Sequence, residues 1–327
     1  MKDFFLLLIT RRLIQLYMPL HKKLISILFF IVQFSIAAKS QAIKSLPKNE
    51  LDFVSDTQQP MTVEKIKLHA NHNTLATSMI FTDILKDNPD AVYLLGDVVA
   101  VGSKNHKWKK VDSFIDSCKN KEIGVHALLG NHDVMFSRKK GEKNFQKRFP
   151  DNVDIGYVSI TDSIAIVMLN SNFKKLSGSE IDKEVNWYKS TLAALDSNTA
   201  IKAIIVSCHH APYTNSTIVG CSKSVQQYFV PAYIQTKKCR LFITGHAHAF
   251  EHFEMQGKNF LVIGGGGGLH QPLNTSDKHI RDMAFNYKPM FHYLSIKIYT
   301  DKLLLTSHFI KENFSGFENG YSFEIKY

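Results

Sequence analysis

The segment EIGVHALLGNHD, residues 122–133, decides how this sequence is interpreted. It contains the apolar run VHALL, which is typical of a buried strand, and it stops at Gly-Asn-His-Asp. Gly130 and Asn131 accept the backbone angles of a turn and Asp133 could cap a helix, so a plain turn is one explanation. The other is chemical, because Asn131 and His132 are potential metal ligands or proton donors and Asp133 can hold an imidazole in place. Residues elsewhere in the chain decide between these explanations.

Four other apolar segments end in the same kind of polar residue. They are ELDFVSD (50–56), AVYLLGD (91–97), KAIIVSCHHAP (202–212) and CRLFITGHAH (239–248). The polar residues at their ends are Asp56, Asp97, the pair His209 and His210, and the pair His246 and His248. Because open α/β sheets bind ligands at the carboxyl ends of their strands, we expect these side chains to converge at one edge.

The rest of the sequence indicates the α/β class. Periodicity predicts a further strand at 163–172 and helices at 62–87, 107–120 and 180–195. Segments 252–263 and 291–327 alternate apolar and polar residues, which predicts antiparallel β structure near the C-terminal end. No repeat or Pro/Ser-rich linker interrupts the chain, so we predict one domain over residues 43–327.

Residues 1–42 have the layout of an export segment. A basic Lys-Lys pair precedes an apolar run of 15 residues, Leu24–Ala38, and small residues suited to cleavage follow it. The run is short for a membrane span. We therefore predict a signal peptide with translation starting at Met18, and a secreted or periplasmic protein that has no membrane span once the signal is removed. A retained N-terminal membrane anchor is the alternative.

Charge and cysteine content narrow the range of partners. The formal net charge is +11, of which residues 1–42 contribute +5 and residues 43–327 contribute +6, without any block of five like charges. This mild excess would help to attract anionic substrates, but the sequence announces no basic groove with stacking aromatics, so we expect no nucleic-acid partner. The spacing of the four cysteines matches no zinc site. In an oxidising compartment one or two disulfides could form, and Cys221 with Cys239 is the pair to test first.

Taken together, the strand-end residues form the ligand set of a metal centre. Two carboxylates, an amide oxygen and several imidazoles suit two divalent ions of borderline hardness. Two ions that share one carboxylate can clamp a phosphate and activate a water for displacement at phosphorus. We therefore expect two divalent metal ions, whose identity (Mn, Zn, Fe or Mg) the sequence does not determine.

The order of the motifs, D-x-Q, GDVVAVG, GNHD, HHAP and GHAH, resembles the calcineurin-like metallophosphoesterases from Asp56 to about Gly268. HAPYTNS, GHAHAFEH and the run GGGGG look most similar to the purple-acid-phosphatase branch. The resemblance implies the metallophosphoesterase fold, which is a four-layer αββα sandwich with two central mixed β-sheets. It also implies an acid-phosphatase-like hydrolase that cleaves small-molecule phosphate mono- or diesters by attack of a metal-bound hydroxide.

The same resemblance implies a role for each residue. The metal ligands would be Asp97 between both ions, Asp56 and His248 on the first, and Asn131, His246 and either His209 or His210 on the second. His132 would stabilise the phosphate or protonate the leaving oxygen, and Asp133 would orient its ring. These roles would explain why an amide, an imidazole and a carboxylate are neighbours in GNHD.

Two points stay open at this level. The spacing His-x-Pro selects His210 as the ligand, which we favour, whereas an ungapped match to the family's HHPP variant selects His209. The run Gly264–Gly268 could cradle a phosphate, or it could let the backbone pass close to the metal centre.

Two positions depart from the family pattern. Its first motif is usually Asp-x-His, but here it is Asp56-Thr57-Gln58, and the amide oxygen of Gln58 is a weaker and harder ligand than imidazole. The first site should therefore bind more loosely, or prefer manganese or magnesium to zinc. Ala100 stands where purple acid phosphatases have a tyrosine ligand, so we expect no tightly held ferric ion. The weakened first site leaves a second hypothesis, a non-catalytic secreted protein that binds a metal or another ligand.

Overall fold

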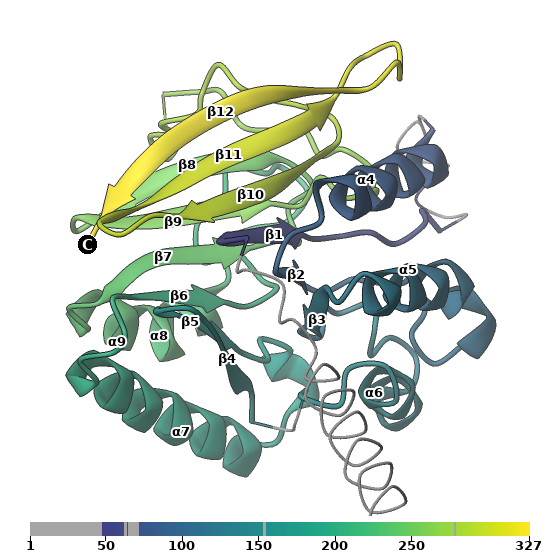
Figure 1. Cartoon of the computed structure of the whole chain (residues 1–327). Helices are drawn as coiled ribbons and strands as arrows, with labels where there is room; N and C mark the ends of the chain where they lie inside the picture. Colours follow the sequence, from purple (N-terminus) through teal and green to yellow (C-terminus); the bar gives the residue numbers. More distant parts are fainter. Residues whose placement is uncertain (1–47, 62–63, 65–71, 153–154, 278) are drawn as a thin grey trace, which may run out of the picture. The chain divides into compact units, whose positions relative to one another are not determined.

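Two six-stranded β-sheets form the centre of the computed structural model of this protein (Figure 1). The structure describes residues 48–327, apart from 62–63, 65–71, 153–154 and 278. The predicted export segment, 1–42, lies outside the described residues, as does part of the helix predicted at 62–87.

The first sheet has the strand order β12-β11-β10-β1-β2-β3. Its strands are β1 (Glu50–Val54), β2 (Ala91–Leu94), β3 (Gly124–Ala127), β10 (His292–Ile298), β11 (Lys302–Ile310) and β12 (Phe317–Lys326). Strands β1, β2 and β3 are parallel, and β10, β11 and β12 continue the sheet in antiparallel fashion. The antiparallel structure predicted near the C-terminal end is thereby confirmed.

The second sheet has the order β4-β5-β6-β7-β9-β8. Its strands are β4 (Tyr157–Thr161), β5 (Ile164–Met168), β6 (Ala203–Ser207), β7 (Cys239–Thr244), β8 (Phe250–Met255) and β9 (Lys258–Ile263). Strands β5, β6, β7 and β9 are parallel, while β4 and β8 run antiparallel to their neighbours. Both sheets are therefore mixed, as expected.

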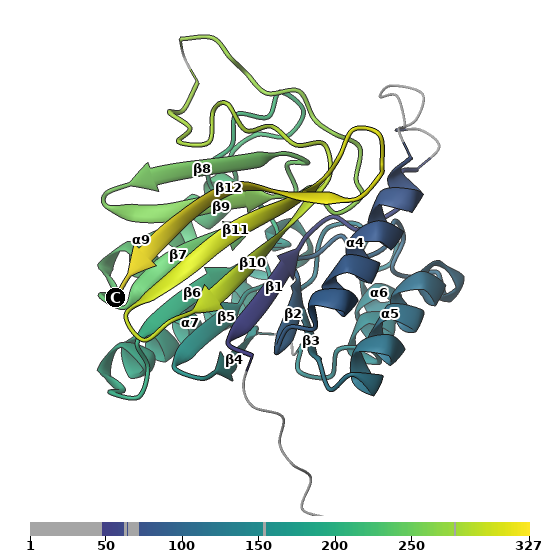
Figure 2. The same ribbon diagram turned by 45° about the horizontal axis from the view of Figure 1, so that its top comes forward.

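Helices cover the outer faces of the two sheets (Figures 1 and 2). They are α4 (Asn73–Asp87), α5 (Lys109–Asn120), α6 (Arg138–Gln146), α7 (Gly178–Ser197), α8 (Lys223–Tyr228) and α9 (Val230–Gln235), with short 3₁₀ turns η1 (Asn105–Trp108) and η2 (Phe173–Lys175). Helices α4, α5 and α6 pack on β1–β3, and α7, α8 and α9 pack on the second sheet.

Three buried clusters correspond to the three interfaces between the four layers. Alternate residues of facing strands, such as Phe53 on β1 and Ile205 on β6, fill the space between the sheets. The residues that point the other way, such as Leu94 and Val206, pack against the helices. The four-layer αββα sandwich is confirmed. The strand ends that carry the candidate ligands belong to both sheets rather than to one.

The expected pairing of Cys221 with Cys239 is not formed, since all four cysteines are free thiols. Cys239 is fully buried in the cluster under α9, whereas the Sγ of Cys221 lies 3.5 Å from the carbonyl oxygen of Thr214 in a partly exposed loop. The two thiols therefore have separate surroundings. Among the described residues, no helix combines the length and the apolar character that crossing a membrane requires.

Candidate metal centre

Three of the candidate ligands lie at sharp turns just beyond their strands. Asp56, Asp97 and His246 have backbone φ angles of 61°, 47° and 67°, in the left-handed region that residues with a Cβ rarely adopt. Such a conformation costs roughly 1 kcal/mol or more, and it persists only where the surroundings enforce it. Its recurrence at three converging turns is the pattern expected of a functional site.

Two motif glycines allow these turns to approach one another. A Cβ on Gly130 would lie 2.2 Å from Asp97 Oδ1, and a Cβ on Gly245 would lie 2.4 Å from Asp56 Oδ2. Any side chain would collide with a candidate ligand at either position. The glycines that open GNHD and GHAH are thus required by the close contact between neighbouring turns.

Asp97 is the carboxylate around which the other groups gather. Its Oδ1 accepts a hydrogen bond from the backbone N–H of His132 at 2.7 Å, and its Oδ2 lies 3.3 Å from Nε2 of His209. Burial alone would raise the pKa of Asp97, but the nearby histidines, above all His209, lower it below the usual range. Asp97 is therefore an anion at neutral pH.

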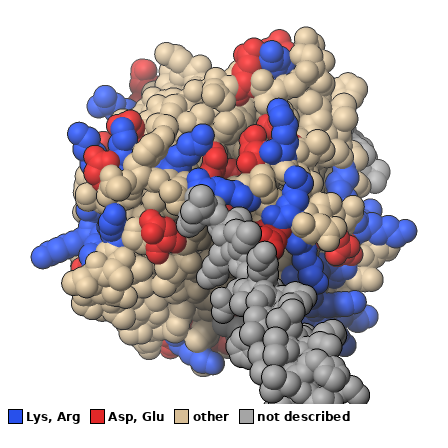
Figure 3. All heavy atoms as spheres, in the orientation of Figure 1, with Lys and Arg blue, Asp and Glu red and all other residues tan. Residues whose placement is uncertain are grey.

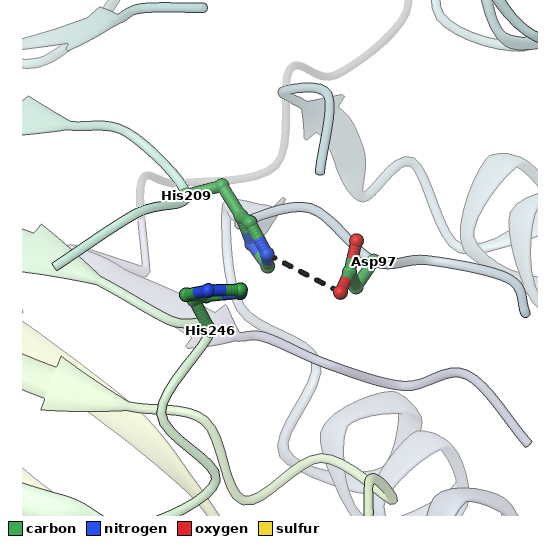
Figure 4. A group of neighbouring side chains, drawn as sticks. All are labelled: Asp97, His209 and His246. Atoms are coloured by element: carbon green, nitrogen blue, oxygen red, sulfur yellow. Dashed lines mark ion pairs between the residues drawn. The ribbon is translucent and has the colours of Figure 1, made fainter. Parts of the chain in front are cut away.

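His209, rather than His210, points toward Asp97 (Figure 4). Its Nδ1 donates to the carbonyl oxygen of Leu95 at 2.9 Å, which leaves Nε2 facing Asp97 and, at 3.2 Å, Oδ1 of Asn131. Burial lowers the pKa of His209, but the carboxylate of Asp97 and other acceptors raise it to about 9.

His210, which we preferred as the ligand, lies beside this group, with its ring centroid 4.5 Å from that of His246, but its Nδ1 faces Ser171 rather than Asp97. Its Nδ1 lies 2.8 Å from the hydroxyl of Ser171, and its ring lines an adjacent cleft. The chain bends at this pair, and the rings of His209 and His210 meet edge to face with centroids 5.1 Å apart. The geometry therefore favours His209, because the spacing of His210 from Pro212 does not reveal which ring faces Asp97.

His246 completes the closest group of potential ligand atoms. One ligand atom each from Asp97, His209 and His246 lie within 4.8 Å of one another (Figure 4). The backbone N–H of His246 donates to Oδ2 of Asp56 at 2.9 Å, which connects the turn after β7 to the turn after β1. The two sheets are thus joined through the candidate ligands themselves.

Asp56, His248 and Gln58 form a second group beside the first. His248 donates through Nδ1 to the carbonyl oxygen of Leu269 at 2.6 Å, so its Nε2 faces Oδ1 of Asp56 at 3.3 Å. With its amide oriented to satisfy its hydrogen bonds, Gln58 donates to the carbonyl oxygens of Asp97 at 2.9 Å and Asp56 at 3.0 Å. The other end of the amide lies 3.4 Å from His248 Nε2, so Gln58 fastens both turns and presents its oxygen to this group.

His132 lies at the edge of the site, and Asp133 does not contact its ring. Nδ1 of His132 is 3.1 Å from the carbonyl oxygen of Ala100, and Nε2 is 3.8 Å from both Asp97 Oδ2 and Glu64 Oε1. Asp133 instead accepts hydrogen bonds from three backbone N–H groups, at 2.9–3.3 Å, in its own turn and the turn after β2. Burial, followed by the charge of Asp97, raises the pKa of Asp133 to about 7. Asp133 therefore does not orient the ring of His132, contrary to our expectation. Its carboxylate instead holds two loops together.

The residues fit divalent cations on two observations. The donor set combines carboxylate oxygens, amide oxygens and imidazole nitrogens whose opposite Nδ1 atoms donate to backbone carbonyls, as is typical of metal-ligating histidines. In addition, Oδ1 of Asp56 is buried and has no hydrogen-bond partner among the described residues. An unpaired buried carboxylate oxygen is costly unless a cation satisfies it.

Several residues that shape the site were not predicted from the sequence. Ser171 and Asn172 follow β5, and the polar end of the segment SIAIVMLNSN carried the same signal as the other strand ends. Glu64 carries no such signal, because it reaches His132 from a helical position and not from the end of a strand. The run Gly264–Gly268 passes close to the site, with Gly268 N–H donating to the carbonyl oxygen of Asp56 at 2.8 Å, which supports the close-passage interpretation.

Comparison with known sequences identifies one protein family. The sequence model described as calcineurin-like phosphoesterase matches residues 51–250, which include every candidate ligand. No curated protein matches the chain at the level of sequence.

Solved structures share the fold at low sequence identity. A purple acid phosphatase from yellow lupin matches with a TM-score of 0.64 and 15% identity over 85% of this chain, which spans 53% of that protein. GAP50, described as the anchor in the inner membrane complex of Plasmodium, matches with a TM-score of 0.62 and 14% identity over 85% of this chain and 88% of its own. A dimetal phosphatase from Danio rerio matches with a TM-score of 0.57 and 12% identity, over 86% of this chain and all (100%) of its own.

Proposed function

The chain belongs to the calcineurin-like phosphoesterase family, and from that membership we propose that it is a dinuclear, metal-dependent hydrolase of phosphate mono- or diesters. The observation that carries the proposal is the convergence of Asp97, His209 and His246, whose ligand atoms lie within 4.8 Å of one another. Oδ1 of Asp56, which is buried and faces Nε2 of His248 at 3.3 Å, supports a second cation beside them.

The contacts suggest how the residues would divide between two ions. Asp97 would be shared, with Asp56, His248 and the amide oxygen of Gln58 on one side, and Asn131, His209 and His246 on the other. Bound divalent ions would supply positive charge to the phosphate oxygens and lower the pKa of a water.

His132 is placed to transfer a proton to the leaving oxygen. Because the carbonyl of Ala100 can only accept, Nδ1 keeps its hydrogen, and Nε2 is the atom that gains and loses a proton. The carboxylates of Glu64 and Asp97 both lie 3.8 Å from Nε2. Once Nε2 has donated, the ring becomes neutral and can accept a proton from water.

The direct test is an assay of purified protein from which metal has been removed. Hydrolysis of p-nitrophenyl phosphate and of bis-p-nitrophenyl phosphate would be compared while Mn²⁺, Zn²⁺, Mg²⁺ or Fe²⁺ is added back. We expect at least one ion to restore turnover, and the ratio between the two substrates to distinguish a monoesterase from a diesterase. A folded protein that hydrolyses neither compound with any ion would contradict the proposal.

We also propose that the protein is exported and that its signal is removed. The support is the sequence of residues 18–42, with its basic pair, apolar run and small residues. N-terminal sequencing of the protein from its native host should find a mature chain that begins near residue 43. Recovery of an intact, membrane-bound chain would favour the retained anchor instead.

A non-catalytic binding protein is the second candidate function. It is favoured by one observation, which is that Gln58 stands where imidazole is usual and uses its amide nitrogen to fasten two backbone turns. The structure of GAP50, described as an anchor, shows that this fold also occurs in a protein described by a non-enzymatic role. One bound ion per chain without hydrolysis would support this candidate, whereas two ions with turnover would exclude it.

A further inference from the structure

A cleft of about 600 Å³ opens beside the candidate metal centre. Its lining includes His246 from that centre, the neighbouring His210, and three lysines, Lys174 and Lys175 of η2 and Lys223 at the start of α8. The volume is in the range of small-molecule sites in proteins. A phosphate bound at the centre would therefore direct the rest of its molecule toward the lysines.

The loop that carries Lys174 and Lys175 is fixed to the metal centre. It follows Asn172, whose Nδ2 donates to the carbonyl oxygen of Leu129 at 3.1 Å, immediately before the GNHD turn. Arg138 donates to the carbonyl oxygen of Lys175 at 2.6 Å. Both lysines therefore belong to a turn that hydrogen bonds hold to the neighbouring segments.

The start of helix α8, which carries Lys223, is fixed in the same way. The backbone N–H of Ser222 donates to the carbonyl oxygen of Ala211, at 2.8 Å, in the turn that carries the paired histidines. The two lysine-bearing segments, η2 and α8, also contact each other through the rings of Phe173 and Tyr228, whose centroids are 5.2 Å apart. The position of the positive charges relative to the centre is therefore set by the fold.

The charge of this cleft has one sign. No aspartate or glutamate is among the described residues that line it. Lys174 and Lys175 make no ion pair with any described residue, and Lys223 donates to a neutral amide oxygen of Gln226 at 3.3 Å. Elsewhere, as over the face in Figure 3, basic and acidic side chains are interspersed. Positive charge without counter-charge in a concave site raises the local concentration of anions.

We propose that this lysine-lined cleft binds a second anionic group on the leaving-group side of the scissile phosphate. The preferred substrates are then phosphate esters whose alcohol part carries a further phosphate or carboxylate, rather than esters of neutral alcohols. The inference rests on the proposed function of the metal centre and adds the class of substrate. The leaving alcohol keeps its own anion, so product release also depends on the lysines.

The test compares two substrates that differ by one phosphate, propane-1,3-diol monophosphate and propane-1,3-diol bisphosphate. The variant replaces Lys174, Lys175 and Lys223 with glutamine. A control variant replaces three exposed lysines that do not line the cleft, Lys119, Lys121 and Lys326, and has the same change in net charge. The ratio of kcat/KM for the bisphosphate to that for the monophosphate is measured for each protein with its working metal.

We expect the wild-type ratio to favour the bisphosphate and to fall about tenfold in the cleft variant, with the ratio of the control variant unchanged. Raising the salt concentration should also lower the wild-type ratio, because screening weakens exposed charges. A wild-type ratio near one, or an equal fall in both variants, would overturn the proposal.

A binding measurement distinguishes the case in which the anion site is absent from the case in which the protein is not a hydrolase. If the wild-type protein hydrolyses neither substrate, calorimetric titration with the bisphosphate replaces the rate assay. Binding that weakens about tenfold in the cleft variant alone would support the anion site while contradicting the catalytic function. No difference in binding between the cleft and control variants would overturn the anion site.

Discussion

Two buried aspartates of the first sheet, one beyond a strand end and one in the middle of a strand, behave in opposite ways. Asp97 lies just beyond β2 among histidines, and Asp52 lies within β1 with both carboxylate oxygens unpaired among the described residues. Burial tends to raise the pKa of each carboxyl. Imidazoles reverse that tendency at Asp97, whereas Glu50, Asp87 and Asp83 reinforce it at Asp52.

The comparison shows what makes one end of the sheet suited to cations. Burial and a carboxylate are common to both positions, so neither is sufficient. The neighbours decide, because histidines lower the pKa of Asp97 among ligands that a metal can share, while other acids add to the effect of burial and raise the pKa of Asp52. The hydroxyl of Tyr293 lies 3.0 Å and 2.7 Å from Asp83 and Asp87, and the ring of His308 stacks on that of Tyr293 with centroids 4.8 Å apart.

The largest effect should come from Asp97→Asn. Asparagine keeps the shape but removes the charge between the two proposed ions, so kcat/KM should fall on the order of a thousandfold with the fold retained. Turnover and circular dichroism measure the two parts of this expectation. Asp52→Asn is the matched control in the middle of β1 and should keep its turnover. Equal turnover in wild type and Asp97→Asn would remove the basis of the comparison.

The next-largest effect should be a difference in activity between variants of His209 and His210. His209→Gln should lower kcat/KM about a hundredfold, because its Nε2 faces Asp97, whereas His210→Gln should lower it less than about tenfold. Parallel assays at saturating metal measure both. A greater loss in His210→Gln would restore the assignment that the His-x-Pro spacing suggested.

The next comparison is between the effects on stability of alanine at Gly130, in the turn after β3, and at Gly124, at the start of β3. Gly130→Ala places a Cβ 2.1 Å from the backbone nitrogen of Asp97, so unfolding should require about 2–4 kcal/mol less. Gly124→Ala at the start of β3 meets its nearest atoms at 3.4 Å, which is ordinary contact, and should change stability by less than about 1 kcal/mol. Urea denaturation of both variants checks the difference, and similar values would show that the turn is more adaptable than its contacts indicate.

The smallest effect concerns Asp52 and depends on pH. Its pKa is raised well above the usual value, so the unfolded chain ionises it at a pH where the folded protein does not, and stability is lost as pH rises above about 4. Asp52→Asn removes this loss. The variant should be more stable than wild type by about 1–3 kcal/mol at pH 7, and the difference should vanish below about pH 4.

Burial is the main cause of that sign, and the charged neighbours of Asp52 modify it. They are Glu50, Asp87 and Asp83, which raise its pKa, and Lys297, which lowers it to a lesser extent. Denaturation at several pH values measures the difference between the two proteins. A variant less stable than wild type at pH 7 would mean that Asp52 is ionised and has a partner.

The sequence was sufficient for much of the fold and for the location of the site. Apolar strands that end in Asp56, Asp97, GNHD, HHAP and GHAH carry a strong signal, because the periodicity and the ligand types agree. The alternation near the C-terminal end likewise predicted the antiparallel strands β10–β12.

The details that the sequence missed depend on contacts between distant segments. The choice between His209 and His210 depends on the carbonyl of Leu95, and the role of Asp133 depends on N–H groups of Val98 and Val99. Neither partner is close in sequence to the residue that it positions. Sequence spacing therefore located the site without fixing its internal geometry.

The most direct test of the account is the number of metal ions bound per chain. Metal-free protein would be dialysed against the ion that restores turnover and analysed by plasma mass spectrometry, alongside Asp97→Asn and Asp52→Asn. The account predicts two ions in wild type and in Asp52→Asn, and fewer in Asp97→Asn. Equal metal content in wild type and Asp97→Asn, or no metal in wild type, would contradict the claim that histidines at this end of the sheet make a buried carboxylate into a cation site.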